Sequence, residues 1–218
     1  MNVSKSNPAT NADIKRIYLP TNTKRNASQL RRLIVHETEV HARRGQNGDE
    51  TGVRALGKGT ADYADVEEGL GVFLECKVAG DLDNLSFHRA RDRYITAGLA
   101  LGADGVPKDG PQTFEILWRL FAIKNSKDGS IDEAAERKAM DQAMVHIENA
   151  FRGTNFAMTG VIYTKLKVYY EGLAKNARFF AEADDLSVAL DMAMIGKYNH
   201  VDPSELKTVQ ELIAFKAA

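Results

Sequence analysis

The chain has 218 residues, of which 44% are hydrophobic and 27% are charged. This length and composition fit a globular domain with a sizeable core, and they exclude a disordered or membrane-embedded chain. Its 29 basic and 30 acidic residues give a formal net charge of −1, which argues against a dedicated binder of nucleic acid or anionic membranes.

The N-terminal part of the chain is expected to contain a tail, one strand and one helix. Residues 1–12 are polar and are expected to form a flexible tail. Alternating apolar and polar residues from Ile14 to Leu19 predict a short strand. A helix is expected to start at Asn26 or Ser28, and Asn47-Gly48 provides a left-handed stop for it.

The rest of the chain is expected to be mostly helical. The stretch 45–59 is polar and rich in glycine, which predicts a loop. Apolar residues at helical spacing and recognisable caps predict further helices at about 62–79, 85–101, 114–123, 132–151, 162–182, 185–196 and from 203 onwards. Because no repeat or long linker divides the chain, we expect one mainly α domain over residues 13–218, with at most a few short strands.

The most informative segment is Val35–His41, VHETEVH, which contains two histidines and a glutamate beside the first of them. These residue types are those of a hydrolytic zinc site. On an α-helix, however, His36 and His41 would diverge by roughly 140° and could not bind one ion. They share a face only if the helix contains an inserted residue, a π-bulge, which is rare and concentrates at functional sites. The alternative is a solvated helix whose histidines form only local hydrogen bonds.

Glu37 is expected to point towards the core of the protein. It continues an apolar stripe at helical spacing that includes Leu30, Leu33 and Ile34 and that extends to His41. A carboxylate on such a face is costly unless it is paired or coordinates a metal ion.

A second segment offers carboxylates that could complete a metal site. Glu67 and Glu68 lie near the start of the helix predicted at 62–79, and a carboxylate is a suitable third ligand beside two imidazoles. Their alternative role is to complement the helix dipole. Glu75, about two turns beyond Glu68, could orient a ligating histidine.

Together the two segments, HETEVHARRGQNG and EEGLGVFLE, resemble the HExxxH metallopeptidases that include the microtubule-associated tyrosine carboxypeptidases and their bacterial relatives. Those proteins pair an HExxxHxxRxxNG helix with a downstream TEEGLA segment. Weaker similarity, for example at Gly196-Lys197, extends the resemblance to roughly residues 13–213. Relatives usually have a substantial helical region before the first motif, which this chain almost wholly lacks. The residues that match the two motifs are His36, Glu37, His41, Arg44, Asn47, Gly48 and Glu67 to Leu70.

The resemblance implies a zincin-like metallopeptidase domain that contains Zn²⁺. The ligands would be His36, His41 and one glutamate, for which we take Glu68 in preference to Glu67. Glu37 would then be the general base that takes a proton from the attacking water.

A carboxypeptidase also needs groups that bind its substrate. Arg44, Arg152 and Lys165 are candidates for binding the terminal carboxylate of a peptide, and Tyr169 is a candidate hydrogen-bond donor to the developing oxyanion. Each has a structural alternative: Arg44 could pair with Glu67 or Glu75, Arg152 and Lys165 could be surface charges, and Tyr169 could pack in the core.

The expected function is therefore a zinc carboxypeptidase that acts on the C-terminus of a protein or peptide. The alternatives are a catalytically weak, truncated relative that binds metal and peptide as an interaction module, and a purely structural helical protein. Neither a nucleic acid nor a membrane is expected as a partner. The single cysteine, Cys76, and the polar N-terminus point to a cytoplasmic location.

Overall fold

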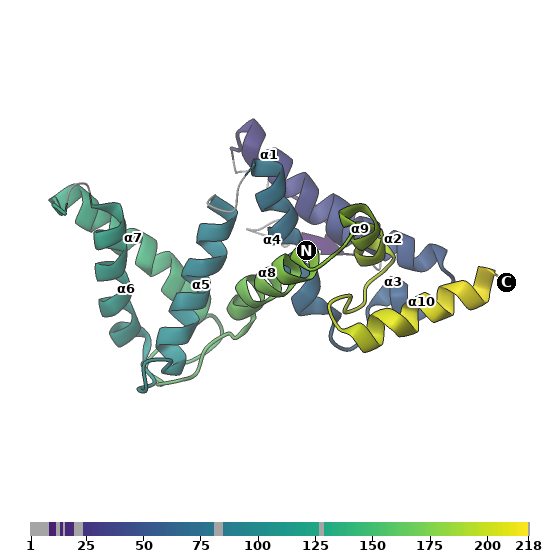
Figure 1. The fold of residues 1–218 in the computed structure, drawn as a ribbon. Coiled ribbons are helices and arrows are strands. Elements are labelled where there is room, and N and C mark those ends of the chain that lie inside the picture. Colours follow the sequence, from purple (N-terminus) through teal and green to yellow (C-terminus); the bar gives the residue numbers. More distant parts are fainter. Residues whose placement is uncertain are drawn as a thin grey trace. The chain divides into compact units, whose positions relative to one another are not determined.

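The computed structural model describes residues 9–11, 14, 16–19, 24–80, 85–126 and 129–217. These residues are mainly helical, as predicted, and their two short strands form one antiparallel pair. The elements up to residue 79 are β1 (Ala9–Asn11), β2 (Arg16–Tyr18), α1 (Ala27–Leu33), the π-helix η1 (Ile34–Ala42), α2 (Arg43–Glu50), α3 (Arg54–Lys58) and α4 (Tyr63–Ala79). The later elements are α5 (Leu85–Leu101), α6 (Gly110–Asn125), α7 (Glu133–Ala150), α8 (Lys165–Ala181), α9 (Leu186–Met194) and α10 (Pro203–Ala217) (Figure 1).

The chain divides into two compact units. Unit 1 consists of Met1–Phe87 and Glu171–Ala218, and unit 2 consists of His88–Tyr170. The segment expected as a flexible tail, 1–12, lies outside the described residues except for 9–11, which form strand β1 instead. Among the described residues, no helix combines the length and apolar character needed to cross a membrane.

The first helical run is longer than the sequence indicated. It starts after Asn26, whose side chain accepts a hydrogen bond from the Gln29 backbone N–H at 2.9 Å, while the Gln29 side chain accepts one from the Asn26 N–H. The stop predicted at Asn47-Gly48 is wrong, because α2 continues to Glu50 and the chain turns at Gly52, which has a φ of 68°.

The glycines of the stretch 45–59 pack helices together, so the predicted loop is also wrong. A Cβ on Gly48 would lie 2.0 Å from the Leu56 carbonyl oxygen, which shows how closely α2 approaches α3. A Cβ on Gly57 would similarly meet the side chain of Asp49 at 2.1 Å. A polar, glycine-rich sequence is typical of a loop, but here the missing side chains let two short helices touch.

In unit 1, helix α4 is held by the C-terminal part of α8. Gly69 is so close to Gly172 that a Cβ on Gly69 would lie 2.0 Å from the Gly172 carbonyl carbon. The Asn176 side chain donates a hydrogen bond to the Val66 carbonyl at 3.0 Å, and the rings of Phe73 and Phe180 stack at 4.8 Å. These contacts fix the axis of α4, which provides the glutamates of the predicted site.

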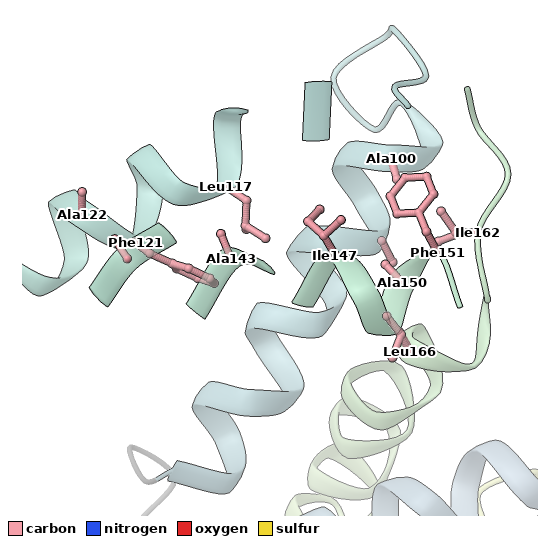
Figure 2. Close-up of a cluster of buried hydrophobic side chains, with 12 residues drawn as sticks. Ala100, Leu117, Phe121, Ala122, Ala143, Ile147, Ala150, Phe151, Ile162 and Leu166 are labelled. Carbon is pink, nitrogen blue, oxygen red and sulfur yellow. The ribbon is translucent and has the colours of Figure 1, made fainter. Parts of the chain in front are cut away.

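The core of unit 2 is built from alanine, leucine, isoleucine and phenylalanine side chains (Figure 2). Helix α6 starts earlier than predicted, because Asp109 and Gln112 form a capping box before the apolar run begins. It is buried on one side only, since Leu120 and Ile123 are exposed. Helix α7 follows its predicted cap, Asp132. The buried residues of this cluster are Ala97, Ala100, Leu117, Phe121, Ala122, Ala139, Ala143, Ile147, Ala150, Phe151, Ile162 and Leu166.

Candidate metal centre

The two histidines lie on a π-helix, which places them on one face. Residues Ile34 to Ala42 form nine consecutive residues of π-helix between α1 and α2. A π-helix joins residues five apart by its backbone hydrogen bonds, so a separation of five brings side chains together. The ring centroids of His36 and His41 are 4.9 Å apart. The prediction of an inserted residue is therefore confirmed, although the π geometry covers the whole segment rather than a single bulge.

Helix α4 brings a carboxylate to both rings. The Glu68 Oε2 atom lies 3.4 Å from His36 Nε2 and 3.8 Å from His41 Nε2. The three potential ligand atoms, one from each residue, all lie within 4.8 Å of one another. Two ligands of a tetrahedral zinc ion with bonds of about 2.0–2.1 Å are about 3.3 Å apart. The three residues thus have the donor types and nearly the spacing of a zinc site.

Each histidine is oriented by a carboxylate of its own. His36 Nδ1 lies 2.6 Å from Glu75 Oε1, and His41 Nδ1 lies 2.8 Å from Glu67 Oε1. When each Nδ1 carries the proton and donates it to these carboxylates, both Nε2 lone pairs are available to a metal ion. The geometry gives Glu67 and Glu75 the role of orienting the histidines, and it leaves Glu68 as the carboxylate between them.

A glycine on α4 makes room for the first histidine. A Cβ on Gly71 would lie 2.6 Å from the Cε1 and Nδ1 atoms of His36. Since real Cβ atoms do not come so close to other heavy atoms, a side chain at this position would push the imidazole away. Gly71, like Glu68 and Glu75, is therefore part of the geometry that holds His36.

Glu67 lies at the centre of a buried ionic network. It is 3% exposed, and it accepts hydrogen bonds from Arg44 Nη1 at 3.0 Å and from Lys197 Nζ at 3.2 Å as well as facing His41. Burial alone would raise the pKa of Glu67, but the hydrogen bond with His41 and the positive charges of Arg44 and Lys197 bring it below its ordinary value. Glu67 thus stays ionised and can hold His41 in place.

The carboxylates of Glu68 and Glu75, which lie beside His36, favour the binding of a cation at the site. Burial alone would lower the pKa of His36, but Glu68 and Glu75 outweigh it and raise this pKa to about 10. In the metal-free protein the imidazole therefore keeps a proton at neutral pH. That proton offsets the negative charge of the glutamates, and a divalent cation bound to the three ligand atoms would do the same. The residues present thus fit a metal ion in charge as well as in donor type.

Glu37 is buried, as predicted, but its surroundings differ from the expected stripe. It is 9% exposed, whereas Leu30 and Ile34, from the same predicted stripe, are 45% and 47% exposed. The stripe was derived for an α-helix, and the change to π geometry at Ile34 moves Glu37 out of register with it. The Thr10 hydroxyl of β1 lies 2.6 Å from Glu37 Oε2 and donates a hydrogen bond to this residue.

Of the predicted substrate-binding residues, Arg44 has the structural role that we considered as its alternative, namely an ion pair with Glu67. Its side chain is fully buried, and it donates to Glu67 and to the Tyr198 carbonyl at 2.8 Å, so its guanidinium is already committed. Asn47, expected as a helix terminator, instead donates to the Met194 carbonyl at 2.7 Å.

The other three candidates lie in unit 2. The guanidinium of Arg152 lies over the ring of Tyr163 at 4.6 Å, and that of Arg93 lies over the ring of Tyr169 at 4.7 Å. Lys165 is exposed at the start of α8. For all three, contact with a substrate stays a prediction.

Two residues at the site were not predicted. Lys197 pairs with Glu67, and the only sign of it was the weak similarity at Gly196-Lys197. Thr10 contacts Glu37, but it falls in a polar stretch of 12 residues with no pattern that marks a functional residue.

The fold and this cluster define a helical protein with a candidate metal centre between a π-helix and a second helix. Residues 6–100 match the family model described as "Microtubule-associated tyrosine carboxypeptidase". This stretch contains both motifs and all the ligand candidates, so the chain is similar to that family over residues 6–100. No match was found among the curated proteins or among the solved structures.

Proposed function

We propose that the protein is a zinc-dependent carboxypeptidase. The observation that carries this proposal is the convergence of the Nε2 atoms of His36 and His41 on Glu68 Oε2, with each Nδ1 held by a separate carboxylate. Three protein ligands with a position left for substrate or water are typical of a catalytic rather than a structural zinc site. The family description of residues 6–100 supports the type of reaction.

In this proposal each residue of the cluster has a defined role. His36, His41 and Glu68 would hold the zinc ion, which supplies a Lewis acid that polarises a peptide carbonyl and makes water more acidic. Glu37 takes the proton of the attacking water and then gives it to the departing amine. Glu67 and Glu75 keep the two imidazoles in the orientation that directs Nε2 to the ion.

The proposed substrate is the C-terminus of a protein or peptide. A carboxypeptidase recognises its substrate by the terminal carboxylate, and an arginine or lysine is suited to bind that group. Because Arg44 is buried and paired with Glu67, we propose that Arg152 or Lys165 has this role, with Tyr169 as a donor to the oxyanion.

The experiment is a digestion of a peptide library, read by mass spectrometry, with the zinc-loaded protein and two variants. Glu37→Gln removes the base but keeps the shape of the side chain, so we expect it to retain zinc and to stop the release of C-terminal residues. Glu39→Gln is the matched control on the same π-helix, because the Glu39 side chain is 43% exposed and pairs with Arg43 at 2.6 Å. It should leave the release unchanged.

The outcome also separates the proposal from the interaction module. If the wild type binds one zinc ion and captures peptides but releases no residue, the module is favoured and the carboxypeptidase is wrong. If both glutamate variants remain active, Glu37 is not the base.

A further inference from the structure

A threonine from the N-terminal strand contacts the proposed general base. Thr10 Oγ1 lies 2.6 Å from Glu37 Oε2 and 3.1 Å from the Glu37 backbone carbonyl oxygen. The hydroxyl thus touches both the tip of this side chain and the backbone from which it extends. A contact at two points restricts the χ angles of Glu37 more than a contact at the tip alone.

This contact matters because few donors among the described residues reach the Glu37 carboxylate. It is 9% exposed, and within the described part of the chain Thr10 is the residue that donates a hydrogen bond to its carboxylate. By contrast, Glu67 faces His41, Arg44 and Lys197. A buried carboxylate with one donor depends on that donor for its orientation.

The position of Thr10 is set by the hairpin of β1 and β2. Thr10 is paired with Ile17, and Asn11 with Arg16, in the antiparallel register. The Asn11 side chain accepts a hydrogen bond from the Ile14 N–H at 3.3 Å. Because successive residues of a strand point to opposite faces, this register directs Thr10 and not Asn11 to the π-helix.

We propose that Thr10 is a positioning residue, which holds the Glu37 carboxylate in the orientation needed to take a proton from the attacking water. This inference rests on the proposed function, and it adds to it a residue from a segment that the sequence presented as a flexible tail. Thr10 acts through Glu37 and touches neither substrate nor metal ligand in this account.

The test compares Thr10→Val, which removes the hydroxyl and keeps the shape, with Thr10→Ser, which keeps the hydroxyl. We expect Thr10→Val to lower kcat by about tenfold, with KM and zinc content unchanged, because a misplaced base slows proton transfer without weakening binding. Thr10→Ser should restore most of kcat. Thr208→Val is the control, because Thr208 is exposed on α10 and its hydroxyl donates to a helix carbonyl, that of Ser204.

A double-mutant cycle with Glu37→Gln shows whether Thr10 acts through Glu37. The cycle is read in the midpoint of urea unfolding, because Glu37→Gln is expected to be inactive; if Thr10 contacts Glu37, the two changes are non-additive in that midpoint. Equal kcat for Thr10→Val and wild type, or additive effects of the two changes on the unfolding midpoint, overturns the positioning role. A wild type that releases no residue overturns the proposed function itself, and the unfolding cycle then still reports whether the contact exists.

Discussion

Two helix pairs in this chain are packed through different kinds of side chain, one through apolar residues and the other through ionisable residues. The pair α6–α7 in unit 2 joins through aliphatic and small side chains, such as Leu117 and Ile147. The pair η1–α4 in unit 1 joins instead through histidines, glutamates and a glycine. Burial of apolar side chains stabilises a fold by itself. Buried charges lose their hydration, and this cost is offset only when their charged and hydrogen-bonding partners are present. This difference is what we expect if η1–α4 holds a metal ion, as proposed.

The largest expected effect comes from removing a partner of the buried network. Arg44→Met leaves Glu67 buried with one cation fewer, so we expect the free energy of unfolding to fall by about 3–5 kcal/mol. Zinc binding should weaken as well, because Glu67 orients His41. Chemical denaturation and zinc titration measure the two effects.

The matched change in unit 2 is Ile147→Ala. It creates a cavity in an apolar cluster and should cost about 2–5 kcal/mol while zinc affinity stays the same. If Arg44→Met leaves zinc affinity unchanged too, the network has no role in holding the ligands.

Two glycine substitutions sharpen the comparison. Gly71→Ala would place a Cβ 2.6 Å from the His36 ring, so we expect a loss of about 1–3 kcal/mol in stability together with weaker zinc binding. Gly98→Ala, in α5, meets only the Cβ of Ala103 at 3.5 Å and should stabilise the protein by about 0.5–1 kcal/mol. Thermal unfolding with and without zinc distinguishes them, and similar effects for both would contradict the close contact at Gly71.

A change in the orienting carboxylates should affect the metal more than the fold. Glu75→Gln removes the charged acceptor of His36 Nδ1 and keeps the size of the side chain, so we expect zinc affinity to fall by about 10–100-fold. Competition with a chromogenic chelator measures this change. The control is Glu115→Gln, at an exposed glutamate that pairs with Arg119. This variant should bind zinc with the same affinity as the wild type.

The smallest expected effect is a dependence of stability on pH at His200. Burial, with a smaller contribution from Arg44, holds the pKa of His200 well below its ordinary value of 6.5. Below pH 6.5 the unfolded chain therefore takes up a proton that the folded protein excludes, and stability is full above this pH and falls as the pH decreases. The slope is at most about 1.4 kcal/mol per pH unit.

His200→Gln tests this dependence. Glutamine does not titrate and can still donate to Asn176 Oδ1, which lies 2.8 Å from His200 Nε2. Urea unfolding of the metal-free variant at pH 5.5 and 7.5 should show a smaller difference than the wild type. An identical difference would mean that His200 is protonated in the folded state.

The sequence predicted the centre of the site better than its surroundings. The π geometry followed from the separation of His36 and His41, because a spacing of five is incompatible with one face of an α-helix. The role of Glu75 also followed from spacing along α4. Such local relations are fixed by helix geometry, which a sequence reveals directly.

Contacts between distant segments could not be predicted in the same way. Thr10 and Glu37 are 27 residues apart, and Lys197 and Glu67 are 130 apart, so only the folded chain brings them together. Gly48 was interpreted as the end of a helix because its contact with Leu56 depends on tertiary packing. Glycine has the same appearance in a sequence whether it turns the chain or lets two helices touch.

The most direct test of the central claim is the metal content of the purified protein and of His36→Ala. We predict about one zinc ion per chain in the wild type and none in the variant, measured by elemental analysis after dialysis. A wild type without zinc that also fails to bind added zinc, or a His36→Ala variant that keeps the full amount, would contradict a metal centre on the π-helix.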